Sequence, residues 1–229
     1  MPKRKKRNFA ELDTFDNIFQ PNMDFVYRND HELKGRWNEI CFKNNNPIVI
    51  EVGCGKGEYS VALAKKYPEK NFIGIDIKGE RLWRGCKTGM EEGIKNLVFL
   101  RSKIEFLCSF FIKNEIDEIW ITFPDPQLKK QKKRLTSSRF LEIYRKILPD
   151  NGKIHLKTDS PDLFQYTSDI VKHNNFDLFY SSDDIYSKEL HSEILSIKTH
   201  YEKIYLLKNK PITYINFSIP ANCTIQEPY

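Results

Sequence analysis

The chain has 229 residues, of which 40% are hydrophobic and 30% charged, and its formal net charge at pH 7 is +6. This length suits one large domain, and the hydrophobic share is sufficient for a buried core. No apolar stretch approaches the roughly 20 residues that a membrane helix needs, and no apolar segment of a secretory signal follows the basic start MPKRKKR. We therefore expect no membrane segment.

The cysteines indicate a reducing compartment. Five are present, an odd number, and none belongs to a C-x-x-C pair, so neither a disulfide framework nor a zinc site is favoured. We expect a cytoplasmic protein without a bound metal. The five are Cys41, Cys54, Cys86, Cys108 and Cys223.

Positive charge is concentrated in two short segments. Residues 3–7 and residues 129–134 each carry five positive charges and no acidic residue. Outside these segments acidic residues outnumber basic ones. Each cluster alone is compatible with a solvated surface or a disordered tail. Two clusters on an otherwise acidic chain favour a partner with a phosphate backbone.

The order of elements predicts an α/β fold. Residues 1–46 look like a basic, polar extension with a short helix over 31–42, and residues 221–229 look like an irregular tail. Between them strands alternate with helices, which predicts a mostly parallel, doubly wound sheet of seven strands that binds ligands at its carboxyl edge. The expected strands are 48–52, 71–77, 97–100, 118–123, 152–158, 178–180 and 212–219. The expected helices are 59–67, 80–90, 104–111, 137–148, 161–174 and 199–208.

A glycine-rich loop follows the first of these strands. Its glycines, Gly53, Gly55 and Gly57, have the spacing G-x-G-x-G rather than the dinucleotide pattern G-x-G-x-x-G. The loop alone is compatible with a simple tight turn. Glu51 precedes it, and Asp76 ends the second strand, where ribose-binding acids lie in nucleotide-binding folds. Glu51 would repel a pyrophosphate and attract a cation, so the loop favours S-adenosylmethionine over NAD.

The most informative segment is EIWITFPDPQLKKQKKR, residues 118–134. A strand ends at a carboxylate, Asp125, which stands between Pro124 and Pro126, and a basic run follows at once. A stiff turn and a solvated loop are the simpler interpretations, because proline restricts the backbone and aspartate is common in turns. Together the two features favour an acid held in a site whose rim attracts nucleic acid.

With these residues in view, the chain resembles the bacterial tRNA (guanine-N7)-methyltransferase family. The resemblance covers about residues 46–220 and rests on EVGCGKG, NFIGIDIKG, ITFPDPQLKKQKKR, the helix after it, IHLKTD and SIKTHYE. It implies a Rossmann-like class I methyltransferase domain over residues 47–220. It also implies S-adenosylmethionine as cofactor, tRNA as partner, guanosine 46 of the variable loop as target, and a monomer or homodimer in the cytoplasm.

The resemblance also assigns roles by position. It implies that Glu51, Gly53, Asp76 and Asp125 bind S-adenosylmethionine, and that Asp125 is the catalytic residue between cofactor and guanine. The substrate contacts that it implies are Lys129, Asp159, Thr199, His200, Tyr201 and Glu202. The other cations of the basic run, Lys130, Lys132, Lys133 and Arg134, are expected to attract phosphates generally.

Simpler interpretations remain open for some of these residues. Asp159 could be a turn or cap residue, and Thr199 to Glu202 reads S/T-x-x-E, a helix capping box. The chain also departs from the family twice. Gln127 stands where the family usually has tryptophan, and Lys103 stands where it usually has aspartate or asparagine at the adenine edge. A lysine can donate but cannot accept a hydrogen bond.

The expected chemistry needs no general base, because N7 of guanine has an in-plane lone pair and no proton. The chain has Pro-Asp-Pro-Gln instead of the D/N-P-P-aromatic signature of amino-group methyltransferases, which makes an exocyclic amine a less favoured acceptor. Three alternatives stay open: a methyltransferase acting on rRNA or protein, an aminopropyltransferase, and an RNA-binding module that has lost its cofactor.

Overall fold

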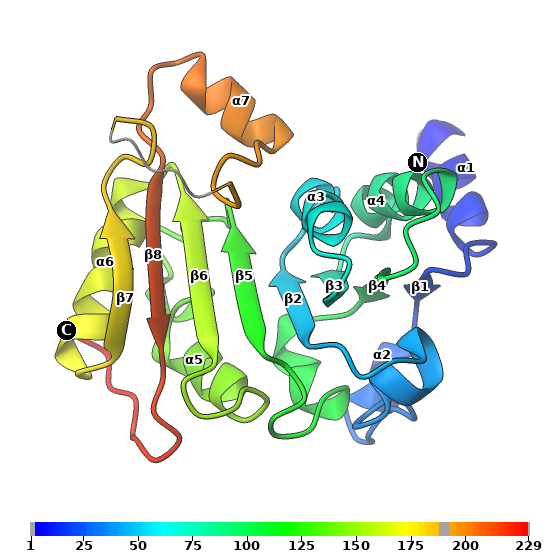
Figure 1. The fold of residues 1–229 in the computed structure, drawn as a ribbon, viewed down its shortest axis with the longest axis horizontal. Coiled ribbons are helices and arrows are strands. Elements are labelled where there is room, and N and C mark those ends of the chain that lie inside the picture. Colours follow the sequence, from blue (N-terminus) through cyan, green and yellow to red (C-terminus); the bar gives the residue numbers. More distant parts are fainter. Residues whose placement is uncertain (1–2, 188–192, 229) are drawn as a thin grey trace. The chain divides into compact units, whose positions relative to one another are not determined.

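Short apolar strands and the helices that connect them form two α/β units, Met1–Ile112 and Lys113–Tyr229. The structure is a computed structural model that describes residues 3–187 and 193–228. Figure 1 shows the elements in chain order.

Four parallel strands form the sheet of the first unit, in the order β1-β4-β3-β2. They are β1 (Ile18–Phe19), β2 (Ile48–Val52), β3 (Asn71–Asp76) and β4 (Leu97–Arg101). Every residue of β2 and β3 is buried, as expected for parallel strands covered on both faces. Glu51 of β2 lies opposite Gly74 of β3, so both strands end at the same edge of the sheet.

Helices connect these strands and cover them. The principal ones are α3 (Glu58–Lys66), between β2 and β3, and α4 (Gly79–Glu91), between β3 and β4. A basic helix, α1 (Lys3–Leu12), packs against α4. The shorter pieces are α2 (Met23–Val26), a π-helix η1 (Trp37–Phe42) and a 3₁₀-helix η2 (Ile104–Ser109). The helix expected over 31–42 is regular only in its second half.

The N-terminal segment is part of the core of the first unit. Trp37 is fully buried, and its indole nitrogen donates a hydrogen bond of 2.8 Å to the carbonyl of Phe110. Its ring stacks on Phe111 with centroids 5.3 Å apart. Leu12 and Val26 are also fully buried. Apolar side chains spaced through residues 12–37 therefore hold this polar-looking stretch against the sheet.

The second unit contains the other four strands, in the order β5-β6-β8-β7 (Figure 1). β5 and β6 are parallel, whereas β8 runs antiparallel to both of its neighbours. The strands are β5 (Glu118–Thr122), β6 (Lys153–Thr158), β7 (Asp177–Ser182) and β8 (Thr213–Ser218). The helices are η3 (Gln131–Lys133), α5 (Ser138–Arg145), α6 (Pro161–His173) and α7 (His200–Leu206). In Figure 1 α7 lies beyond the carboxyl ends of β5 and β6.

All seven expected strands are present, and most end within two residues of the expected position. The described residues hold eight strands rather than seven, because the two-residue β1 adds to the edge beside β4. Across residues 3–187 and 193–228, no helix is long and apolar enough to cross a membrane. All five cysteines are free thiols.

Candidate functional site

The glycine-rich loop between β2 and α3 has a backbone that only glycine adopts easily. Gly53, Gly55 and Gly57 all have positive φ, at 72°, 57° and 68°. A Cβ atom added to Gly57 would lie 2.5 Å from the ring of Phe99, so the loop rests directly on this buried side chain. At Gly55 a Cβ would meet nothing within 4 Å, which leaves the backbone open to a ligand.

Glu51, at the end of β2, is held by the first turn of α3. Its side chain is only 3% exposed, and its Oε2 accepts hydrogen bonds from the backbone N–H of Ser60, at 2.9 Å, and from the Ser60 hydroxyl. A buried carboxylate needs such partners. Glu51 therefore fixes the start of α3 and also adds negative charge beside the glycine loop.

Asp76, at the end of β3, ties the loop to the neighbouring strand. Its Oδ2 accepts a hydrogen bond of 3.0 Å from the N–H of Gly55, and its Oδ1 accepts one of 2.8 Å from the backbone N–H of Lys78. Burial, with Glu51 and Asp76 nearby, raises the pKa of Cys54 well above its usual value, so this loop cysteine stays a thiol. Glu51, Gly53 and Asp76 thus lie together at the carboxyl ends of β2 and β3, where the two carboxylates favour a cation.

In the second unit, the loop after β5 is strained. Phe123 and Gln127 both have φ of 47°, which is uncommon for residues other than glycine and is often found at functional sites. Between them, Oδ1 of Asp125 accepts a hydrogen bond of 3.0 Å from the N–H of Gln127. The exposed Asp125 therefore closes a turn with one oxygen and presents the rest of its carboxylate to solvent. Gln127 supplies the left-handed residue of this turn.

The buried side chain of Arg134 supports this loop. It is only 5% exposed, its Nε donates a hydrogen bond of 3.1 Å to the carbonyl of Pro126, and its guanidinium lies 4.5 Å from the ring centre of Tyr166. The expectation that Arg134 attracts phosphates from the surface is wrong, because its side chain is buried. The lysines at 129, 130, 132 and 133 are all exposed and keep that role available.

Asp159 lies at the carboxyl end of β6. Its Oδ2 is 3.2 Å from Nζ of Lys210, and this lysine also lies 5.1 Å from the ring centre of Tyr205 in α7. The Tyr205 ring in turn lies 6.0 Å from that of Phe123. These contacts connect Asp159, α7 and the end of β5.

The segment from Thr199 to Glu202 begins α7 and forms the capping box that its sequence predicts. Oγ1 of Thr199 accepts a hydrogen bond of 3.2 Å from the N–H of Glu202, and Oε2 of Glu202 accepts one of 3.4 Å from the N–H of Thr199. Glu202 is fully buried, whereas His200 and Tyr201 are exposed, Tyr201 by 44%. Only the middle of the segment presents its side chains to solvent.

The structure thus groups the predicted residues by unit. The three cofactor residues Glu51, Gly53 and Asp76 lie together in the first unit. Asp125, Lys129, Asp159 and the segment 199–202 lie in the second. Sequence reasoning missed Arg134 as a loop support, and it missed Lys157 of β6. For Lys157 one signal exists: a lysine near the end of KIHLKT, a segment expected to form a core strand.

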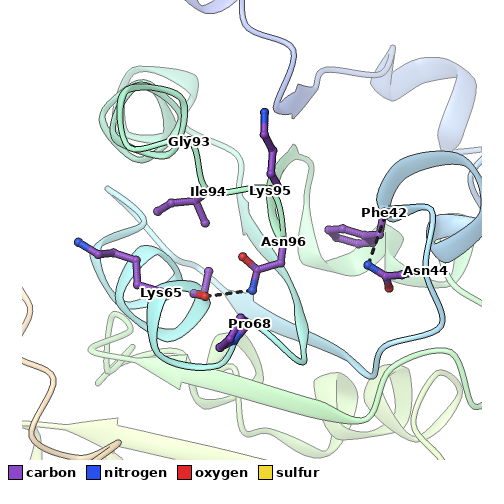
Figure 2. Close-up of a pocket in the computed structure, with 9 residues that line it drawn as sticks. Phe42, Asn44, Lys65, Pro68, Gly93, Ile94, Lys95 and Asn96 are labelled. Atoms are coloured by element: carbon purple, nitrogen blue, oxygen red, sulfur yellow. Dashed lines mark hydrogen bonds between the residues drawn. The ribbon is translucent and has the colours of Figure 1, made fainter.

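Lys103 is exposed, and its Nζ lies 5.5 Å from the ring centre of Phe106. One cavity of about 400 Å³ lies between the end of α3 and the start of β4 (Figure 2), where Asn96 donates to the carbonyls of Ala64, Tyr67 and Lys70 and so caps α3. A second, of about 690 Å³, lies beside the start of α6 and has an acidic lining. Within the described residues, no group of three or more acidic, histidine or cysteine side chains is arranged to hold a metal.

Comparison with known proteins covers nearly the whole chain. Residues 45–215 match the model of a family described as "Putative methyltransferase". Proteins named tRNA (guanine-N(7)-)-methyltransferase are 50% identical over 220 residues in Christiangramia forsetii and 48% identical over 221 residues in Porphyromonas gingivalis. A protein with the same name in Bacteroides fragilis is 44% identical over 228 residues. These alignments cover 95%, 95% and 100% of this chain and 98%, 91% and 90% of the relatives.

Solved structures show the same fold at low sequence identity. The 16S rRNA methyltransferase KamB has a TM-score of 0.65 at 13% identity, covering 83% of this chain and 95% of its own. A variant of 16S rRNA (adenine(1408)-N(1))-methyltransferase with S-adenosylmethionine, from Catenulisporales acidiphilia, has a TM-score of 0.57 at 13% identity, covering 81% of this chain and 90% of its own. These likenesses confirm the expected Rossmann-like α/β fold of class I methyltransferases.

Proposed function

This chain belongs to the tRNA (guanine-N7)-methyltransferase family, and from that premise we propose that it transfers a methyl group from S-adenosylmethionine to N7 of a guanine in tRNA. The target that the family implies is guanosine 46 of the variable loop. The observation that carries the proposal is 50% identity to a protein of that name over 95% of the chain.

The residues at the edge of β2 and β3 fit the cofactor, which supplies the transferred methyl group. S-adenosylmethionine is cationic at its methionine end, and the acids Glu51 and Asp76 flank the glycine loop on which it would lie. The open space beside Gly55 lets a ligand approach the backbone. We assign the cationic end to the region of Glu51 and Gly53, and the ribose hydroxyls to Asp76.

Asp125 is assigned to the guanine. Methylation at N7 leaves the ring positively charged, and a carboxylate can accept hydrogen bonds from the N1–H and amino edge and stabilise that charge. Asp125 accepts a hydrogen bond from Gln127, and Arg134 donates one to the carbonyl of Pro126. These two bonds fix the direction of the carboxylate. Correct orientation of reacting groups can supply up to ~7–11 kcal/mol, so a rigid loop serves this reaction without a general base.

The exposed lysines are assigned to the tRNA backbone. Lys129 follows the Asp125 turn most closely, and three further exposed lysines come within the next four residues. Phosphate contacts of this kind make affinity fall steeply with salt. Asp159, His200 and Tyr201 lie on the same unit and complete the proposed substrate contacts. We place the reaction in the cytoplasm, with the enzyme acting as a monomer or homodimer.

The test is a comparison of methyl acceptors. The protein is incubated with labelled S-adenosylmethionine and, in parallel, with unmodified tRNA, rRNA or total protein, and the modified base is mapped. We expect label only on a variable-loop guanine of tRNA. Label on an adenine, label on rRNA or protein, or none on tRNA would contradict the proposal. Calorimetry with S-adenosylmethionine tests the alternative of an RNA-binding module that has lost its cofactor. Such a module would give no heat of binding.

A further inference from the structure

A buried ion pair joins β6 to the start of α7. Nζ of Lys157 lies 2.7 Å from Oε1 of Glu202, and both side chains are 0% exposed. Burial lowers the pKa of Lys157, and the adjacent Glu202 carboxylate opposes that effect. The lysine is the fifth of the six residues of β6, a core strand, where a charged residue is rare unless it has a partner.

The same lysine also holds the chain that leads into α7. Its Nζ donates hydrogen bonds of 2.9 Å to the carbonyls of both Leu195 and Ile197. Leu195 is itself buried. Three of the groups around Nζ therefore belong to residues 195–202, and together they fix where α7 begins.

Glu202 also accepts a hydrogen bond from the segment that follows β7. The hydroxyl of Tyr186 donates a hydrogen bond of 2.7 Å to Oε1 of Glu202, and the carboxylate raises the pKa of that tyrosine together with burial, which is the larger cause. The N–H of Ile185 is bonded at 2.9 Å to the carbonyl of Ile212. The segment that follows β7 and the segment that precedes α7 therefore both bond to the Lys157–Glu202 pair.

Stability alone does not account for a pair of this kind. Desolvation of two charges offsets much of their attraction, and replacing a buried ion pair by apolar residues of similar volume is often neutral or stabilising. What an apolar pair cannot reproduce is the set of directional bonds to two carbonyls, one hydroxyl and the helix cap. Those bonds determine the position of His200 and Tyr201, the exposed residues of the first turn.

We propose that Lys157 is a positioning residue for tRNA: it holds the start of α7 so that His200 and Tyr201 contact the substrate. The inference rests on the proposed function, in which His200 and Tyr201 touch tRNA. Lys157 itself touches neither tRNA nor cofactor, because its side chain is fully buried. Glu202 belongs to the same support, and its assigned substrate contact becomes an indirect one.

The test uses the double variant Lys157→Met/Glu202→Met, which removes both charges and keeps most of the volume. We expect its Tm to fall, because the carbonyls of Leu195 and Ile197 and the hydroxyl of Tyr186 lose their partners, so KM is measured at a temperature well below that Tm. We expect KM for tRNA to rise about tenfold, the change that a loss of one well-oriented contact produces, while KM for S-adenosylmethionine stays within about twofold.

The matched control is Ile154→Ala, a buried position in the same strand that makes none of these bonds. It should lower Tm and leave KM for tRNA unchanged at a temperature well below Tm. An unchanged tRNA KM in the double variant would overturn the inference. If the double variant does not fold, Glu202→Gln, which removes one charge at constant shape, should raise the tRNA KM, and an unchanged value would overturn the inference equally.

A third variant separates this inference from the proposed function. Tyr201→Ala removes an exposed side chain and leaves the buried pair intact. A raised tRNA KM in Tyr201→Ala beside a wild-type value in the double variant would refute the positioning role alone. A wild-type tRNA KM in Tyr201→Ala would refute the contact on which the inference depends. No methylation of tRNA by the wild-type protein would refute the proposed function itself.

Discussion

Arg134 offers the sharpest test of how the Asp125 loop is held. Arg134→Ala removes a hydrogen bond from a charged donor to the carbonyl of Pro126 and a contact with the face of Tyr166. Charged hydrogen bonds contribute about 1.5–3 kcal/mol, and a desolvated cation–π contact contributes about 2 kcal/mol. The two share one guanidinium and do not add fully, so we expect a loss of about 2–4 kcal/mol in unfolding free energy.

The effect on activity should exceed the effect on tRNA affinity. Without Arg134 the carboxylate of Asp125 loses its fixed direction, and misplacement of a reacting group by about 1 Å can lower the rate about a hundredfold. We expect kcat to fall about tenfold to a hundredfold. Arg134→Lys should recover little, because a lysine cannot supply both the Nε–H donor and the planar face.

The control is Lys133→Ala, which removes the same charge from the exposed neighbour. Its Tm and kcat should match wild type, and the slope of log affinity against log salt should become shallower by roughly 0.7–0.9. Arg134→Ala should leave that slope unchanged. The reasoning fails if Arg134→Ala changes the salt slope as Lys133→Ala does, or if it keeps wild-type Tm and kcat.

Three further outcomes are expected. Gly57→Ala should unfold at lower temperature and bind S-adenosylmethionine more weakly in calorimetry, because its Cβ would meet the Phe99 ring at 2.5 Å and its φ is +68°; wild-type values for both would contradict this. Asp125→Asn should keep the turn and lower kcat by about 10²–10³, as the loss of one charge-stabilising group does, and unchanged turnover in a single-turnover assay would remove its role. Hydrogen bonding to Lys87 lowers the pKa of Glu11 from 4.5, so its contribution to stability is present above pH 4.5 and is lost as pH falls through the lower folded pKa. Acid unfolding of Glu11→Gln should lack this component, and an identical acid profile would contradict it.

The sequence predicted those parts of the structure that depend on local patterns. The strands 48–52 and 118–123 are short, mostly apolar runs that glycine or proline follows, and such runs have recognisable boundaries. Asp76 was found because it ends a strand, and Asp125 because it follows a strand closely. The capping box at Thr199 was predicted from its spacing and is present.

The remainder depended on partners distant in sequence. β1 is only two residues long and forms by pairing with β4, so no local pattern reveals it. Arg134 stands in a run of exposed lysines and was grouped with them, although it alone turns inward. The function of Lys157 depends on Glu202 of α7 and on carbonyls at 195 and 197, which only the folded chain brings together.

The central claim is that N7 of a tRNA guanine is the atom methylated, and a modified substrate tests it most directly. A tRNA that carries 7-deazaguanosine at the target position has a carbon in place of N7 and hence no lone pair there. We predict that the protein binds this tRNA with wild-type affinity and transfers no methyl group to it. Methylation of that tRNA at the wild-type rate would contradict the account.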